Sequence, residues 1–145
     1  YVQWCEKIGW AHSESLGLNL ADYQRLDRAM AIRRGEYDYL LPTSAGEELT
    51  MATWLMATSS KLSMERRFQL VRNRDQATIL RGRWELVCIE LSTGQARRMP
   101  PEFCAIYLPE GFRARVERLL LRLTVPKPSY RCSRSMTSCI GSTEG

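Results

Sequence analysis

Two side chains suited to binding an anion stand at the start of a predicted strand. Lys61 and Ser63 are two residues apart. A lysine meets a phosphate as a point charge, and a serine hydroxyl can donate a hydrogen bond to it. The pair is therefore our candidate for phosphate binding. The alternative is that Lys61 is an ordinary basic residue in the turn before the strand.

Two arginines follow in the same predicted strand. Arg66 and Arg67 could add positive charge for the same ligand across a subunit interface. Arg66 also interrupts a face of the strand that is otherwise apolar. We therefore expect Arg66 at a subunit boundary or a sheet edge rather than in the core.

The candidates for acid–base chemistry are few. Glu6 and Glu14 lie on a predicted helix, opposite its apolar stripe, which favours a solvated surface position. Asp38 stands between two tyrosines of a predicted strand, so it faces outward if they face inward. His12 borders the apolar stripe without a nearby serine or cysteine nucleophile pattern, and a packed or partly exposed helix histidine is favoured.

The cysteines suggest neither a disulfide framework nor a metal site. The five cysteines form no CxxC pair, and the chain has a single histidine. An odd number of scattered cysteines is typical of reduced thiols in a cytoplasmic protein. We therefore expect a cytoplasmic protein with no metal site.

Composition excludes several classes of protein. The 145 residues are 44% hydrophobic and 26% charged, which is typical of one globular domain. The net charge of +5 lies almost wholly after residue 104, because residues 1–104 hold 14 basic and 13 acidic residues. A near-neutral core argues against nucleic-acid binding. No apolar run approaches the roughly 20 residues that span a bilayer, so we expect no membrane association.

Hydrophobic periodicity predicts one helix followed by strands. Apolar residues at helical spacing indicate a helix over residues 2–16, which Gly17 ends. A connector follows through Asp27. Strands are predicted over residues 28–41, 49–58, 62–71 and 77–91, with a short return strand over 97–99. The first strand changes parity at Gly35, where we expect a β-bulge. Short connections indicate antiparallel neighbours, and therefore an α+β fold.

The last third of the chain has a different composition. Residues 110–123 could form an amphipathic helix with its arginines facing outward, and residues from Thr124 onward have the composition of a loose tail. We therefore divide the chain into a domain over residues 1–103 and a basic extension over 104–145.

The order of several short motifs resembles one family. The helix that opens with Tyr1-Val2-Gln3-Trp4-Cys5-Glu6 and closes with Ser15-Leu16-Gly17-Leu18 is similar to the central helix of hotdog-fold acyl-CoA thioesterases of the 4-hydroxybenzoyl-CoA thioesterase type. Further similar motifs are Tyr37-Asp38-Tyr39-Leu40-Leu41-Pro42, Gly46-Glu47-Glu48-Leu49-Thr50, Lys61-Leu62-Ser63, Thr93-Gly94 and Pro100-Pro101-Glu102-Phe103. The resemblance spans about residues 1–103.

The resemblance implies a hotdog fold, in which an antiparallel sheet wraps around one long central helix. It also implies hydrolysis of an acyl-CoA thioester to the free acid and CoA, without a cofactor or metal, by a homodimer or homotetramer. The first amides of the helix, near Tyr1, would stabilise the oxyanion. Lys61, Ser63, Arg66 and Arg67 would bind CoA.

The sequence departs from the family in one respect. The catalytic aspartate of the family would precede Tyr1, as would the first strand, so we expect an N-terminally truncated copy with doubtful turnover. The edge of the sheet that the missing strand leaves open would promote association. Two alternatives stay open: a non-catalytic, hotdog-like module for acyl-thioester binding or dimerisation, and a basic tail that binds acidic partners.

Overall fold

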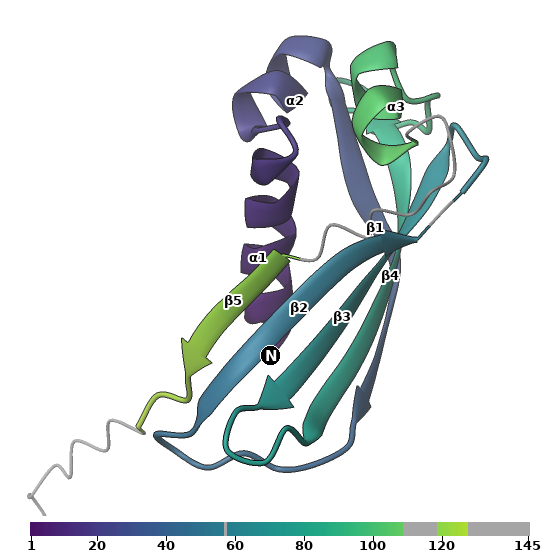
Figure 1. Ribbon diagram of the computed structural model, residues 1–145. Helices are drawn as coiled ribbons and strands as arrows, with labels where there is room; N and C mark the ends of the chain where they lie inside the picture. The colour runs from purple at the N-terminus through teal and green to yellow at the C-terminus, as the bar shows by residue number, and fades with distance from the viewer. Residues whose placement is uncertain (57, 109–118, 128–145) are drawn as a thin grey trace, which may run out of the picture.

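The computed structural model describes residues 1–56, 58–108 and 119–127 (Figure 1). Its helices are α1 (Val2–Ser15), α2 (Leu20–Leu26) and α3 (Pro101–Tyr107). Its strands are β1 (Arg28–Tyr39), β2 (Glu48–Met56), β3 (Ser63–Arg72), β4 (Thr78–Glu90) and β5 (Leu119–Thr124). None of the helices in these residues is long and apolar enough to span a membrane.

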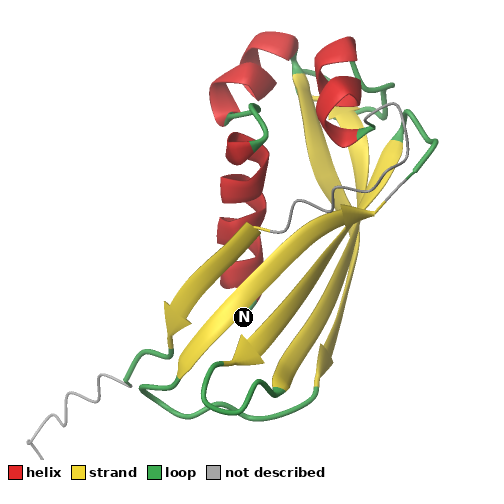
Figure 2. Cartoon of the chain, in the orientation of Figure 1, coloured by secondary structure: helices red, strands yellow, loops and turns green. Residues whose placement is uncertain are grey.

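The five strands form one antiparallel sheet in the order β1-β4-β3-β2-β5. The long helix α1 lies along one face of this sheet (Figure 2). The predicted α+β class, the long helix and the four main strands are therefore confirmed. Because β3 is the middle strand, a residue on its α1-facing side lies at the centre of the molecule.

The helix α1 ends where the sequence predicts. Gly17 has a φ of +101°, a left-handed conformation that glycine adopts without a steric penalty. The second helix, α2, was not predicted, because it falls in the segment interpreted as a connector. A local signal marks its start: the side chain of Asn19 accepts a hydrogen bond from the backbone of Asp22, and the side chain of Asp22 accepts one from the backbone of Asn19.

The first strand is irregular, as expected, but at a different residue. The register of β1 against β4 shifts between Ile32 and Arg34, so the unpaired residue is Arg33, two residues before Gly35. Before the shift the even-numbered residues of β1 face the core, and after it the odd-numbered ones do. Met30 and Tyr37 therefore both pack against the buried hydrophobic core. Gly35 has a packing role instead, because an added Cβ would lie 3.4 Å from the Trp84 ring.

The C-terminal part of the described chain corrects two expectations. Residues 119–123, predicted as the end of an amphipathic helix, belong to β5, which pairs with β2; residues 110–118 and the tail from 128 onward lie outside the described residues. The predicted return strand over 97–99 is also wrong, since only an isolated bridge between Ile89 and Ala96 forms there. The outer edge of β2 is therefore covered by β5 rather than open.

The segment after the two prolines forms α3, which the sequence did not predict. Proline fixes its own φ near the helical value and has no N–H to satisfy, so Pro101 suits the first turn of a helix. This helix contributes Phe103 and Tyr107 to the core, where both are buried. Their rings pack edge-to-face, and Phe103 also contacts the ring of Tyr23 on α2. The helix therefore ties the segment that follows β4 to the two N-terminal helices.

Candidate functional site

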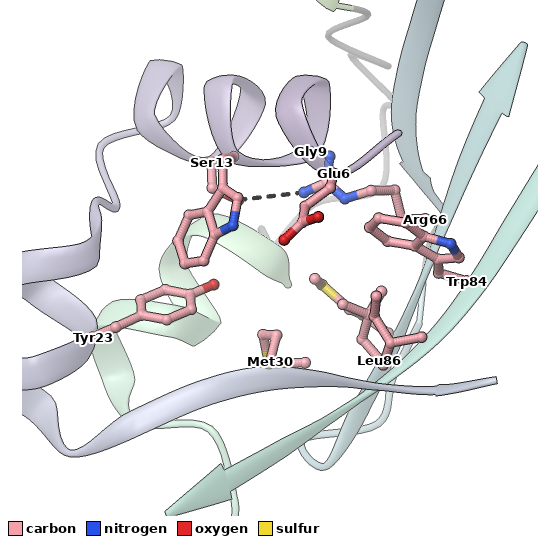
Figure 3. Close-up of a pocket in the computed structure, with 11 residues that line it drawn as sticks. Glu6, Gly9, Ser13, Tyr23, Met30, Arg66, Trp84 and Leu86 are labelled. Atoms are coloured by element: carbon pink, nitrogen blue, oxygen red, sulfur yellow. Dashed lines mark hydrogen bonds between the residues drawn. The ribbon is translucent and has the colours of Figure 1, made fainter. Parts of the chain in front are cut away.

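A pocket of about 270 Å³ lies between α1 and the sheet. The helices α1 and α2 and the strands β1, β3 and β4 line it (Figure 3). Much of its wall is apolar, with Met30, Met64, Trp84 and Leu86 contributed by the strands. A small concave site with apolar walls and few polar groups is typical of a ligand-binding pocket.

Arg66 is the buried one of the two charged residues that line this pocket. Its side chain follows Met64 and precedes Phe68 on the buried face of β3, and the residue is only 2% exposed. The expectation of a sheet edge or subunit boundary is therefore wrong: Arg66 lies in the middle strand, under α1. Figure 3 shows its guanidinium beside Gly9 of the helix.

Three polar side chains hold the guanidinium of Arg66. Its Nη1 donates to His12 Nδ1 at 2.9 Å and to Thr53 Oγ1 at 3.3 Å, and its Nη2 donates to Ser13 Oγ at 3.3 Å. Because a guanidinium only donates, the Nδ1 of His12 must be the acceptor and therefore carries no proton in this contact. His12 thus packs in the interior, which is one of the two positions, packed or partly exposed, that the sequence favoured.

The network continues from Ser13 to two tyrosines. The hydroxyls of Ser13 and Tyr107 are 3.1 Å apart, and those of Tyr107 and Tyr23 are 2.6 Å apart. Burial, reinforced by the neighbouring Tyr107, holds the pKa of the Tyr23 phenol far above its usual value, so the phenol stays neutral. The chain of hydrogen bonds therefore links α1, α2, α3 and β3 around the guanidinium without supplying a negative charge.

The charge of Arg66 has no carboxylate partner among the described residues. The ion pairs of this part of the chain do not include it. Burial lowers the pKa of the guanidinium, but an arginine remains protonated in proteins. Arg66 is therefore a buried positive charge whose hydrogen-bond partners are all neutral, which is a costly arrangement unless something else compensates it.

Glu6 lines the same pocket from α1 and is the only acidic residue among the described lining residues. Its side chain is exposed, as the sequence predicted, but the exposed face of the helix at this point borders the pocket. Glu14 is exposed too and does not line the pocket. Sequence periodicity identifies the solvated face of α1 but not the part of that face that borders a cavity.

The other predicted binding residues lie apart from Arg66. Lys61 and Ser63 are exposed near the beginning of β3, and Ser63 Oγ donates to Ser60 Oγ at 3.2 Å. Arg67 points to the opposite face of the sheet from Arg66, and its Nε donates to Glu65 Oε1 at 2.6 Å. The structure therefore does not bring these four residues together, and only Arg66 lines the pocket.

The first turn of α1 begins away from the pocket. The carbonyl of Tyr1 accepts hydrogen bonds from the amides of Trp4 and Cys5, each at 3.0 Å, and the Tyr1 hydroxyl lies 2.7 Å from Thr43 Oγ1. Tyr1 is not among the residues that line the pocket. Within the described residues, no three His, Cys, Asp or Glu side chains are grouped so that they could hold a metal ion.

Comparison with known proteins places this arrangement in a family. The chain belongs to the thioesterase-like superfamily, which matches residues 1–106. A comparison with curated proteins gives no match.

Solved structures with a similar fold include two CoA thioesterases. The 1,4-dihydroxy-2-naphthoyl-CoA thioesterase from Synechocystis is 19% identical, with a TM-score of 0.64 over 76% of this chain and 81% of the other. The DHNA-CoA thioesterase from Staphylococcus aureus is 20% identical, with a TM-score of 0.61 over 75% and 68%. The SAV2348 protein of Staphylococcus aureus, solved in complex with CoA, is 15% identical, with a TM-score of 0.62 over 72% and 64%. These likenesses confirm the hotdog-like α+β fold.

Proposed function

We propose that the protein hydrolyses an acyl-CoA thioester to a free acid and CoA, with the acyl group in the pocket under α1. Membership of the thioesterase-like superfamily supports the reaction class. The observation that carries the proposal is a pocket with a carboxylate, Glu6, on its lining and a wall that is otherwise mostly apolar. Such a wall suits the acyl group, while the polar CoA would remain outside.

In this proposal Glu6 activates the water molecule. The carboxylate takes a proton from water as the oxygen attacks the thioester carbonyl, and the C=O electron pair moves onto its oxygen. The tetrahedral intermediate then re-forms the carbonyl and expels the CoA thiolate, which takes up the proton. Water is consumed, and one acid and one thiol are released.

The binding of CoA would fall to residues outside the pocket. Lys61 and Ser63 are exposed near the beginning of β3, where a phosphate could reach them from solvent. Arg67 shares the outer face of β3 with Ser63, where its Nε donates to Glu65, and in this proposal it adds positive charge for CoA across an interface with a second copy of the chain. A homodimer or homotetramer is part of the proposal, and analytical ultracentrifugation measures it directly.

The experiment is a thiol-release assay on CoA thioesters with matched variants of α1. Glu6→Gln is expected to lower kcat by about 100-fold or more, because removing a general base typically costs that much. Glu14→Gln, on the same helix and away from the pocket, is the control and should be unchanged. In the same assay Lys61→Met should raise KM and leave kcat unaltered.

Two results would contradict parts of this proposal. Turnover that persists in Glu6→Gln would remove Glu6 from the reaction. Binding of CoA thioesters without thiol release would favour the alternative function, a non-catalytic module that binds acyl thioesters or dimerises.

A further inference from the structure

We propose that the pocket selects acyl groups that end in a carboxylate, which pairs with the guanidinium of Arg66. The substrates would then be monothioesters of short dicarboxylic acids or of carboxylated rings. This inference rests on the proposed function for its reaction, but the binding of a carboxylate in the pocket can be measured separately.

The first argument is the charge of Arg66. The residue is 2% exposed, and its partners His12, Ser13 and Thr53 supply dipoles but no negative charge. A buried charge usually has an opposite charge beside it, because desolvation is expensive. Within the described residues no such partner is present, so a ligand carboxylate would supply the missing charge.

The second argument is which N–H groups of Arg66 remain available. A guanidinium has five N–H groups. The two on Nη1 donate to His12 and Thr53, and one of the two on Nη2 donates to Ser13. The Nε–H and the second Nη2–H have no acceptor in the described part of the chain. Nε and Nη2 are both bonded to Cζ and together form one edge of the guanidinium. That edge can hold both oxygens of a carboxylate.

The third argument is the space beside that edge. Gly9 of α1 lies over Arg66, and a Cβ added to Gly9 would be 3.8 Å from both Cδ and Nε of the arginine. Because Gly9 has no side chain, the space next to Nε stays part of the pocket. A ligand oxygen can therefore approach the edge from the pocket side.

The fourth argument is the size and shape of the rest of the pocket. A cavity of roughly 150 Å³ accommodates benzene, so the 270 Å³ here suits a single ring or a short chain. Glu6 precedes Gly9 by three residues and Ser13 by seven, which corresponds to about 4.5 and 10.5 Å along the helix. A short acyl group can therefore extend from the thioester near Glu6 to a terminal carboxylate at Arg66.

The test compares two CoA thioesters of equal length. Adipoyl-CoA and hexanoyl-CoA differ only in ending with a carboxylate or a methyl group. The full chain is expected to prefer adipoyl-CoA by at least tenfold in kcat/KM. Arg66→Met should abolish the preference while hexanoyl-CoA is still hydrolysed, and Arg66→Lys should give an intermediate preference because the charge stays but the paired N–H edge is lost. Arg81→Met, an exposed arginine of β4 on the opposite face of the sheet, is the matched control and should keep the preference.

Binding of the free acid separates this inference from the proposed function and does not depend on turnover. Isothermal titration calorimetry with adipate and with 1,6-hexanediol, which has six carbons and no charge, should detect adipate alone, and the signal should disappear in Arg66→Met. If the unaltered chain hydrolyses both thioesters equally well, the inference is overturned while the proposed function stands. If neither thioester is hydrolysed but adipate binds through Arg66, the proposed function fails and the carboxylate site stands. Equal binding of adipate and 1,6-hexanediol by the unaltered chain, or no binding of adipate, overturns the inference, even where the arginine variants do not fold.

Discussion

Replacing Gly9 with alanine should stabilise the protein and impair its pocket at the same time. Gly9 is buried in the middle of α1, where glycine costs roughly 0.5–1 kcal/mol relative to alanine. The added Cβ would lie 3.6 Å from the Trp84 ring and 3.8 Å from Arg66, which are ordinary contact distances. The methyl group therefore fits without a clash, and we expect the free energy of unfolding to rise by about 0.5–1 kcal/mol, or a few degrees in Tm.

The same methyl group occupies the space beside Arg66 Nε. An acyl group that uses this space would have to move, and overpacking a filled site typically costs about 1–3 kcal/mol. Since each 1.4 kcal/mol is a factor of ten, kcat/KM for the preferred thioester should fall by about 5- to 150-fold. Thermal unfolding and thiol release on the same preparation give both values.

A matched control is available on the same segment. Gly17 has open space around it but a φ of +101°, so Gly17→Ala should destabilise the protein by about 1–2 kcal/mol without affecting the pocket. The two glycine-to-alanine changes thus have opposite expected effects on stability. A destabilised Gly9→Ala protein would refute the packing of α1 against β3 and β4. Unaltered kcat/KM in that variant would refute the position of the acyl group.

Two further predictions concern the buried network and the end of α2. Tyr107→Phe should lower the free energy of unfolding by about 1–3 kcal/mol in urea titrations, because its hydroxyl lies within hydrogen-bonding distance of both Ser13 and Tyr23. Tyr23→Phe should cost less, and an equal or larger cost would contradict this network. The hydroxyl of Ser92 lies 2.6 Å from the Asp27 carboxylate and holds the pKa of Asp27 below its usual 3.8. This contact therefore stabilises the fold above pH 3.8, and its contribution is lost as the pH falls through the pKa of Asp27 in the folded protein. Asp27→Asn should therefore flatten the fall of Tm below about pH 4, and an unchanged acid profile would exclude the contact.

The sequence predicted the regular elements well and the position of Arg66 poorly. Strict alternation located β3, and helical spacing located α1, because each has one face in the core. The same alternation contained the signal for Arg66, which shares its parity with Met64 and Phe68. A charge on an apolar face was interpreted as a boundary because its partners are remote: Ser13 is 53 residues away and Thr53 is 13 residues away.

The elements that the sequence did not predict were missed for different reasons. The helices α2 and α3 have only seven residues each, which is too short for periodicity to show, and only the Asn19–Asp22 capping box marks the first of them. The strand β5 was predicted as helix because its leucines and arginine also fit a helical stripe. Pairing with β2 decides in favour of the strand over the helix. Because β2 is distant in the sequence, a local pattern of residues cannot reveal this pairing.

The position of β5 has a consequence for biosynthesis. Thr124 of β5 contacts Glu48 of β2, which lies 76 positions earlier in the chain. At roughly 5–20 residues per second, a ribosome needs about 4–15 s to synthesise that stretch. The strands β3 and β4 can pair with their neighbours during this interval, but the outer edge of β2 must wait. Until β5 is made, the unpaired N–H and C=O groups along this edge of β2 can bind other partners. Chaperones, and the β2 strands of other chains being translated from the same mRNA, therefore compete with β5 for this edge.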